Sequence, residues 1–500
     1  MDEIVKSAMA RFQAAERDKQ VHKSKIEDCY RYCMPWRHLE NNTQPSPQRI
    51  DDIFDGIGMV VLEDFASDML ATFTPGGSQW VEFMPSRALD TGEQRQIQEA
   101  MGQYATVLFS EMARSSLYQA LQEAYNDLGP GTMALVINDP GPSEPLHCEA
   151  IPIPELWIDR GPRGDVDGKF RKKLVRGRHI KTLWPDAKVN VVGGLQVRGQ
   201  DEVEFTVYEH LTRNWSVPGT EIWDYLVTVG GDVIVKREYR GEGSCPIIVA
   251  RWSRDSTTAW GVGPTYRSVP DIKVLQYVAE KGLAHLDKII DPVTSYVDDG
   301  VTNVSAGLEP GSWLARALGS DAPEVIESSQ NFDLAEYKID EIRQRVRRNH
   351  FQDRPEQLGK TPPTATQWMD EAAEKARRMG TPATNLVQEL QYPIIKRFAY
   401  LLARRGVLPE VRLNDDVIQL MPVSPLMRAQ AQEEVMRIDR WAEQVQLRLG
   451  PEQAALVING PAMAKRTAEL MGVPVGLFRS KEEIQKIMAA AQQAAPAEGA

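Results

Sequence analysis

Apolar side chains recur every three or four residues along much of this chain, and that spacing predicts amphipathic helices. The clearest stripe lies within residues 271–290 and comprises Ile272, Leu275, Ala279, Leu283, Leu286 and Ile290. Pro292 ends this helix because proline lacks a backbone donor and restricts the residue before it. A second stripe, which begins near Asp333, comprises Leu334, Ile339, Ile342 and Val346. The segment between the two helices is rich in Gly, Pro, Val and Thr, which is typical of strands and turns.

Further helical patterns flank this helix–insert–helix unit. They cover residues 1–40, 53–73, 99–127, 364–406 and the chain from residue 423 onward. The helix expected over residues 364–406 should kink or break at Gly380, Pro382 and Pro393, because each of these residues disturbs the backbone hydrogen bonds of a helix.

Period-two alternation predicts a β-rich region between the third helix and the helix–insert–helix unit. Its expected strands are residues 133–137, 149–153, 155–158, 170–175, 203–210, 221–229, 232–239 and 245–252. Gly230-Gly231 favours a tight hairpin between two of them. Isolated strands are expected at 79–83 and 411–420. The order of helices, a β region, a helix–insert–helix unit and a helical end predicts an α+β fold.

Composition is consistent with a folded, water-soluble chain of more than one packed region. The chain has 500 residues, of which 42% are hydrophobic and 26% are charged, and this length exceeds what one core usually serves. No apolar stretch is long enough to predict a membrane span, and the N-terminus lacks a secretory signal pattern. The four cysteines do not form a disulfide framework, so we expect buried free thiols in a reducing cytoplasm.

Charge is distributed unevenly around the insert. Residues 291–333 hold eight acids and one base, while the chain as a whole carries a formal charge of −12. The acids are Asp291, Asp298, Asp299, Glu309, Asp321, Glu324, Glu327 and Asp333, and the base is Arg316. The helix that follows ends in the opposite sign, with Arg343, Arg345, Arg347 and Arg348. A solvated acidic loop beside a solvated basic helix face would also explain this pattern.

The sequence contains no recognisable catalytic motif. Gly359-Lys360-Thr361 looks like the end of a phosphate-binding loop, but Arg354 stands where that motif needs glycine and Pro362-Pro363 follow where a helix must begin. There is no H-E-x-x-H, no C-x-x-C pair and no G-x-S-x-G, and the seven histidines are scattered. We therefore expect no enzyme, no metal and no cofactor.

Five short motifs occur in an order that resembles the portal, or head-to-tail connector, proteins of short-tailed double-stranded DNA bacteriophages. They are residues 73–81 (FTPGGSQWV), 127–132 (DLGPGT), 260–264 (WGVGP), 363–367 (PTATQ, followed by Arg377-Arg378) and 423–430 (VSPLMRAQ). Each motif is weakly specific alone, and their order carries the resemblance. Gln367 departs from the family pattern, which usually has an acid there.

The resemblance implies a ring of twelve chains at one capsid vertex, through which DNA is packaged and ejected. It implies a portal-protein fold with these parts: a wing (residues 1–263), stem helices (264–290 and 333–351), a small β-containing clip (291–332), a tunnel loop (352–363), a long kinked helix and strand returning to the wing (364–422), and a helical crown with the C-terminal tail (423–500). The implied location is the virion, after assembly in the host cytoplasm.

Charge suggests which residues would serve the implied functions. Basic side chains bind phosphates whereas acids repel them, so the candidates for weak DNA contact in the channel are Arg343, Arg347, Arg348, Arg354 and Lys360. These arginines could instead pair with acids such as Asp340 and Glu341. The candidates for docking the motor and the tail adaptor are Asp298, Asp299, Glu309, Asp321, Glu324 and Glu327, whose partner surfaces would be basic.

The implied partners are other copies of the chain, the packaging motor (terminase large subunit), tail adaptor and tail proteins, capsid and scaffolding proteins, and double-stranded DNA, without a membrane. Two other functions stay open at this point. The chain could be a scaffold or adaptor of the virion that conducts no DNA, or a DNA-packaging enzyme subunit, although the latter lacks a phosphate-binding loop.

Overall fold

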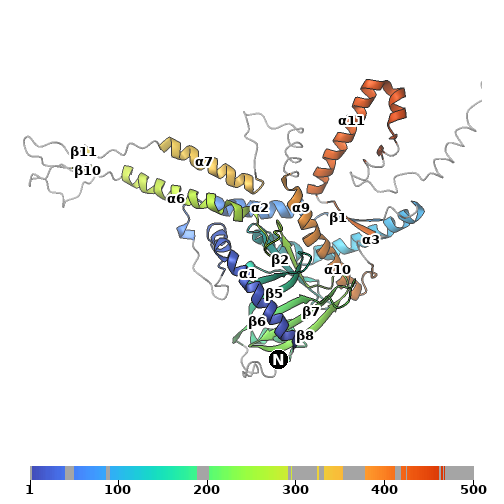
Figure 1. The fold of residues 1–500 in the computed structure, drawn as a ribbon, viewed down its shortest axis with the longest axis horizontal. Helices are drawn as coiled ribbons and strands as arrows, with labels where there is room; N and C mark the ends of the chain where they lie inside the picture. The colour runs from blue at the N-terminus through green and yellow to red at the C-terminus, as the bar shows by residue number, and fades with distance from the viewer. Residues whose placement is uncertain are drawn as a thin grey trace, which may run out of the picture.

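A computed structural model of the protein describes residues 3–39, 50–85, 91–188, 202–290, 294–295, 324–325, 332–352, 378–411, 418–423, 425–460, 463–464 and 467. Helices and sheets are mixed within one body, from which two helices project (Figure 1). This arrangement confirms the mixed helix-and-sheet class expected from the sequence.

The larger sheet is a five-stranded antiparallel meander in the order β4-β5-β6-β7-β8. Its strands are β4 (Leu156–Arg160), β5 (Val166–Arg176), β6 (Glu204–Arg213), β7 (Ile222–Val229) and β8 (Asp232–Arg240). The predicted Gly230-Gly231 hairpin joins β7 to β8, and both glycines have positive φ (59° and 91°) as such a turn requires.

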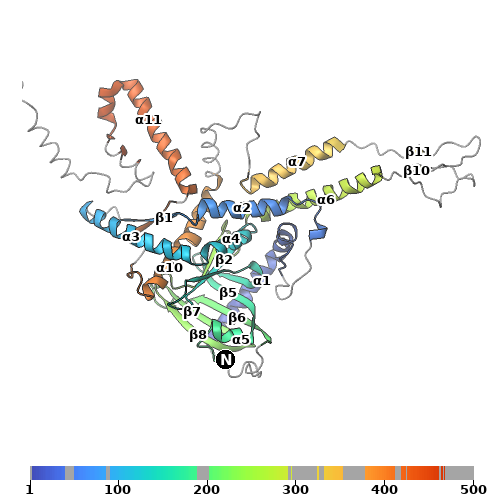
Figure 2. The same cartoon turned by 180° about the vertical axis from the view of Figure 1, so that it is seen from behind.

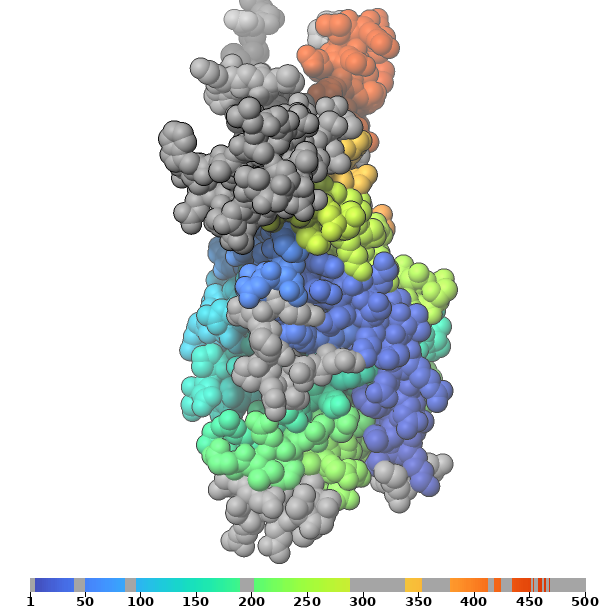
Figure 3. All heavy atoms as spheres, turned by 90° about the vertical axis from the view of Figure 1, so that its left-hand side faces the viewer, coloured from blue at the N-terminus to red at the C-terminus, as the bar shows by residue number. Residues whose placement is uncertain are grey.

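A long helix, α1 (Glu3–Cys33), lies against this sheet, because its apolar side meets aromatic residues of the strands. Phe12 packs edge-on against Phe170 with ring centroids 5.7 Å apart, and Ala15 joins the same cluster. Figure 3 shows α1, in dark blue, running along the body next to the green strands.

A smaller sheet in the order β3-β2-β9 forms the centre of the body. Its strands are β2 (Thr132–Asn138), β3 (His147–Ala150) and β9 (Ile247–Arg251), and every residue of β9 is buried. The helices around it are α2 (Ile57–Phe73), α3 (Thr91–Arg114) and α4 (Leu117–Leu128), with a short turn η2 (Ile153–Glu155), and they share one large core with it. Short helices η1 (Ile50–Asp52) and α5 (Gly177–Leu183) lie outside this group.

The C-terminal part of the chain returns to the same body. Strand β12 (Ile418–Pro422) pairs antiparallel with β1 (Val81–Pro85). Before it come α9 (Gly380–Leu386), the π-helical turn η4 (Val387–Gln391) and α10 (Tyr392–Arg404), and after it comes α11 (Pro425–Val457), which bends at Gly450. The π turn lies directly before Pro393, which has no N–H for the carbonyl of Glu389, so the predicted irregularity is confirmed.

Two helices, α6 (Pro264–Ile290) and α7 (Phe332–Asn349), project side by side from the body, as Figures 1 and 2 both show. A helix of the length of α6 spans about 40 Å. Between them, β10 (Thr294–Ser295) pairs antiparallel with β11 (Glu324–Val325). The predicted helix–insert–helix unit is therefore present, with a strand pair in its insert.

Several boundaries differ from those that the sequence predicted. Each strand expected between residues 132 and 252 overlaps one in the structure, but the single helix expected over 99–127 is two helices. The break lies at Ser115-Ser116, where the Ser115 hydroxyl accepts the N–H of Leu117 and the Ser116 hydroxyl accepts that of Cys148. Serine side chains compete in this way with helical hydrogen bonds.

All four cysteines are free and buried, as expected. In the described part of the chain, no helix has both the length and the apolar content needed to cross a membrane.

Candidate functional site

The projecting helices α6 and α7 start from a joint in which two glycine-containing segments cross in close contact. The N–H of Gly263 donates to the carbonyl of Pro130, and that of Thr265 donates to the carbonyl of Gly129, both at 3.0 Å. A Cβ on Gly263 would lie 2.1 Å from the Gly129 oxygen, and one on Gly131 would lie 2.3 Å from the Gly261 oxygen. Only glycine fits at such distances, which explains two of the motifs found in the sequence.

A buried carboxylate fastens the same joint to α1. Asp127, at the end of α4, accepts a hydrogen bond of 2.9 Å from the Tyr30 hydroxyl and two of 2.9 Å from Arg37. Burial raises the pKa of Asp127, while Arg37 and Tyr30 oppose that rise by stabilising the charged form. Arg37 in turn has its pKa raised, chiefly by Asp127. This buried pair costs desolvation and is favourable only because its hydrogen bonds are satisfied.

His350 connects the two projecting helices at their base. Its Nδ1 lies 2.8 Å from the carbonyl of Val346, to which it donates, and its Nε2 accepts from the Thr265 hydroxyl at 2.9 Å. Thr265 lies in the first turn of α6, whereas His350 directly follows α7. Burial lowers the pKa of His350 to about 4, so the ring is neutral near pH 7.

The end of α7 is closed by a Schellman motif with an unusual residue. Phe351 has φ of 61°, a value that normally requires glycine, and the N–H of Gln352 donates to the carbonyl of Arg347 at 3.0 Å. The Phe351 ring packs on Trp252 with centroids 5.5 Å apart, and the Gln352 amide donates to the carbonyl of Val61 on α2. The surrounding packing thus holds Phe351 in a conformation that a bulky side chain rarely adopts.

Polar side chains along the inner surface of the pair fix its direction. Arg345 on α7 binds Asp271 on α6 at 2.6 Å, and Asn349 donates to Ser268 at 3.1 Å. Gln276 accepts the N–H of Phe54 at 2.8 Å, which ties α6 to the segment before α2. Together with the joint, these contacts hold the base of the pair rigidly on the body.

The structure separates the proposed channel arginines. Arg343 is committed within the chain, because it binds the buried Asp55 at 3.1 Å and Asp340 at 3.4 Å. Arg347 and Arg348 are exposed, and neither forms an ion pair with another described residue. Among the described residues, pairing with nearby acids is therefore seen for Arg343 and is not seen for Arg347 or Arg348.

The remaining candidates lie mostly outside the described residues. Arg354 and Lys360 do so, as do Asp298, Asp299, Glu309, Asp321 and Glu327. Glu324 is placed by its backbone alone, in β11 opposite Ser295.

Sequence reasoning missed the residues that build the joint. Asp127, Arg37 and His350 carry no local signal, because each finds its partner far along the chain: Thr265 is 85 positions from His350 and Asp127 is 90 from Arg37. The two glycine motifs, residues 127–132 and 260–264, were recognised by resemblance. Neither motif alone indicates that the two segments cross in the fold.

The outer surface of α6 exposes large apolar side chains on two opposite sides of the helix, because about 3.6 residues per turn put Val274 and Tyr277 on one side and Leu283 and Leu286 on the other. Val274, Tyr277, Leu283 and Leu286 are 47%, 62%, 50% and 41% exposed, although Leu283 and Leu286 belong to the predicted stripe. Ile272 and Leu275, from the same stripe, are fully buried against the body. The stripe therefore has a base that packs within the chain and an outer part, Leu283 and Leu286, that is about half exposed.

The fold and this projecting pair define a structural protein with surfaces suited to macromolecular contacts. Among the described residues, no group of three or more His, Cys, Asp or Glu side chains is arranged to hold a metal ion. The chain belongs to the bacteriophage head to tail connecting protein family, whose model matches residues 5–478. It is accordingly a head-to-tail connector, as the sequence motifs had indicated.

The chain is also similar to individual known proteins and solved structures. The chain is 24% identical over 410 residues to the portal protein of Salmonella phage epsilon15, an alignment that covers 77% of this chain and 71% of that protein. A chain from the virion of a native gene transfer agent particle is similar at 13% identity and a TM-score of 0.38, covering 85% of this chain and 92% of that one. A chain from the neck of the native particle, computed with C12 symmetry, has 13% identity and a TM-score of 0.36, with 91% and 99% covered.

Proposed function

We propose that twelve copies of this chain assemble into a ring at one capsid vertex. Double-stranded DNA passes through the centre of this ring during packaging and ejection. The observation that carries the proposal is the projecting helix pair, whose base is fixed and whose outer α6 surface is apolar. Exposed apolar surface of this kind is typical of a protein interface.

The occupant that best fits this surface is the α6–α7 pair of a neighbouring copy. Val274, Tyr277, Leu283 and Leu286 lie along one projecting helix, and each is 41–62% exposed. Helices that pack side by side bury such ridges against each other. Repetition of this contact around an axis produces a tube, which is the geometry that a conduit for DNA needs.

The parts of the chain then take the following roles. Residues 1–263 and 364–422 form the wing, α6 and α7 the stem, residues 291–332 the clip and residues 352–363 the tunnel loop, while residues 423–500 form the crown. The strand pair β10–β11 supports a β-containing clip, and the π-helical break before α10 supports a kinked wing helix.

Charge sets how DNA would travel through this ring. Exposed Arg347 and Arg348 near the base of the stem offer weak contacts to phosphates, whereas the acidic clip repels the backbone and keeps the duplex from adhering. The clip acids of all copies in the ring together form one docking surface. The packaging motor and the tail adaptor bind this surface at different times. The chain itself needs no catalytic activity for this role.

Axial images of the purified protein test the proposal. We expect rings with a central hole wide enough for duplex DNA. The Leu283→Asp variant should shift the population toward monomers, because it places a charge on the outer α6 surface, while Val217→Asp, at an exposed apolar position between β6 and β7, provides the matched control. Monomers from the unmodified chain under all conditions, or rings without a hole, would contradict a conduit and favour an adaptor that conducts no DNA.

A further inference from the structure

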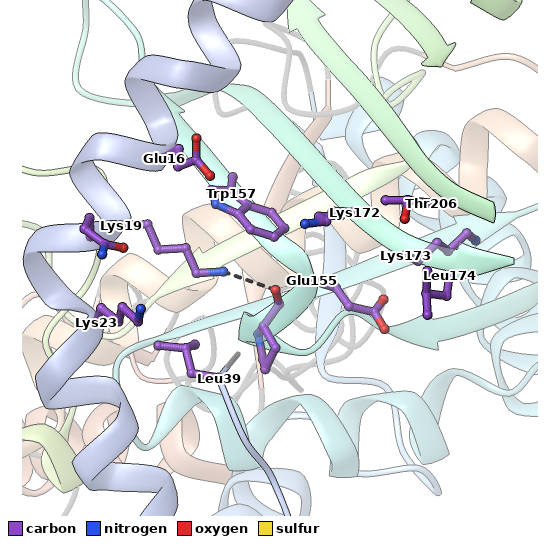
Figure 4. Close-up of a pocket in the computed structure, with 12 residues that line it drawn as sticks. Glu16, Lys19, Lys23, Leu39, Glu155, Trp157, Lys172, Lys173, Leu174 and Thr206 are labelled. Atoms are coloured by element: carbon purple, nitrogen blue, oxygen red, sulfur yellow. Dashed lines mark hydrogen bonds between the residues drawn. The ribbon is translucent and has the colours of Figure 1, made fainter. Parts of the chain in front are cut away.

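A pocket of about 440 Å³ lies in the body, between α1 and strands β4, β5 and β6. Its lining includes four lysines and two glutamates: Lys19, Lys23, Lys172, Lys173, Glu16 and Glu155. Figure 4 shows Lys19 reaching from α1 toward the opposite wall, with Trp157 and Lys172 on the strands. None of the residues that line this pocket belongs to the projecting helices α6 and α7.

The lining carries a net positive charge, because its four lysines outnumber its two glutamates. Glu155 accepts a hydrogen bond of 2.9 Å from Arg171, a cation outside the pocket lining that also pairs with Glu149. Lys173 is likewise engaged by Glu209 at 3.3 Å. Lys19 and Lys172 are therefore the cations whose charge is directed to the pocket.

Lys19 is held rigidly in place. Its ammonium donates to the carbonyls of Ile153 at 2.6 Å, Leu156 at 2.8 Å and Pro154 at 3.3 Å, and it lies 3.8 Å from the centroid of the Trp157 ring. Its three N–H groups are therefore engaged, and Lys19 attracts an anion in the pocket through its charge. The residue is 7% exposed. Burial and the nearby charge of Lys172 lower the pKa of Lys19 to about 7, so the two ammonium groups repel each other when both are charged.

Lys172 has a different environment. It is an exposed residue of β5, and its contact among the described residues is with the Tyr208 ring, 5.7 Å from its Nζ. A bound anion between Lys172 and Lys19 would relieve their repulsion and provide Lys172 with a charged partner. Leu39, Pro154 and Leu174 add apolar surface to the same lining.

We propose that this pocket binds a small organic phosphate monoester, with the phosphate at Lys172 and Lys19 and the organic part against Leu39 and Leu174. A phosphate monoester carries a charge of roughly −1.5 to −2 near pH 7. This charge matches two lysines better than the single negative charge of a carboxylate ligand would. The pocket volume falls in the range of roughly 300–1,000 Å³ that is usual for organic ligands and is larger than inorganic phosphate needs.

Calorimetric titration of the full-length protein with AMP as the probe tests this site. We expect saturable binding, about tenfold weaker in Lys172→Gln, because a charge-assisted contact of this kind accounts for roughly that factor. Lys181→Gln removes the same charge from an exposed position on α5, outside the pocket, and should bind AMP as the unmodified protein does. Lys172 is exposed, so its substitution leaves the core intact.

Inorganic phosphate and adenosine, titrated in the same way, separate the two parts of the ligand. Each should bind more weakly than AMP if both the charge and the organic part contribute. The proposal is overturned by an absence of saturable AMP binding, by equal losses in the two lysine variants, or by phosphate that binds as tightly as AMP. Ring formation is measured separately, in axial images. A failure of AMP binding therefore does not count against the ring, and a failure of ring formation does not count against the AMP site.

Discussion

Individual residues at the base of the projecting helices hold the joint between these helices and the body together. Arg343 stands among the basic residues that the sequence offered for DNA contact, yet it neutralises Asp55, whose side chain is 4% exposed. Breaking such a pair leaves a buried charge without its partner, which is strongly destabilising. Loss of Arg343 would therefore act on stability, and Arg347 and Arg348 are the positions at which substitution reports on DNA contact.

His350 should make stability depend on pH. Its pKa is lowered from 6.5 to about 4 in the folded chain, so between these values the unfolded chain binds a proton that the folded chain does not. The contribution of His350 to the free energy of unfolding should therefore fall as the pH drops from 6.5 toward 4, by about 3 kcal/mol. Urea denaturation across this range measures the slope.

The His350→Gln variant identifies the residue responsible. Glutamine keeps a donor and an acceptor but does not titrate, so the variant should lose the His350 contribution to the slope. His210, whose pKa is also lowered to about 4, keeps its own contribution in both proteins. His285→Gln, on the projecting part of α6, serves as the control. Identical slopes for the unmodified chain and His350→Gln would exclude His350 as the titrating group.

At the scale of elements, α6 depends on the glycine crossing for its direction. The helix begins at Pro264, directly after Gly263, whose N–H is bound to the carbonyl of Pro130. Arg345–Asp271 and Asn349–Ser268 then align α7 with it. The direction of the projecting pair is therefore set by a few contacts at its base, and a change there should alter the whole stem.

Alanine substitutions of Gly263, directly before α6, and of Gly282, within α6, should change the stability of the protein in opposite directions. Gly263→Ala places a methyl group 2.1 Å from the Gly129 oxygen and should destabilise the protein by about 3 kcal/mol or more, because backbone atoms must move. Gly282→Ala meets nothing within 4 Å and should stabilise α6 by about 0.5–1 kcal/mol. Melting temperatures of the two variants provide the comparison, and equal shifts would contradict the close crossing.

At the scale of the whole molecule, the acidic insert is the part of the chain that connects the two projecting helices. Neutralising Asp298, Asp299, Glu324 and Glu327 together to their amides should leave folding and ring formation intact. Attachment of the motor or the tail should weaken, or DNA passage should slow, because the basic partner surfaces would no longer meet acids of opposite charge on this chain. Packaging yield and tail joining are the measurements. Unchanged values would show that these acids are solvated surface.

Much of the element order could be predicted because it depends on local periodicity. The buried strand Ile247–Arg251, the Gly230-Gly231 hairpin and the paired stem helices all follow from short-range patterns. Boundaries failed where side chains made distant contacts: Ser116 ends one helix by accepting the N–H of Cys148, which is 32 positions away. The pocket lysines gave no signal either, since Lys19 and Lys172 meet only when α1 lies on the sheet.

The sequence by itself determined the amphipathic stripes, the glycine motifs, the acidic insert and the family, because each depends on residue identity and spacing along the chain. Tertiary structure decided which charges remain available, since burial pairs Arg343 with Asp55 and leaves Arg347 and Arg348 exposed. It also decided which half of the α6 stripe is covered: Ile272 and Leu275 meet the body, while Leu283 and Leu286 extend past it. The physical reason is that periodicity records which side of a helix is apolar, whereas only the packed fold determines what lies against that side.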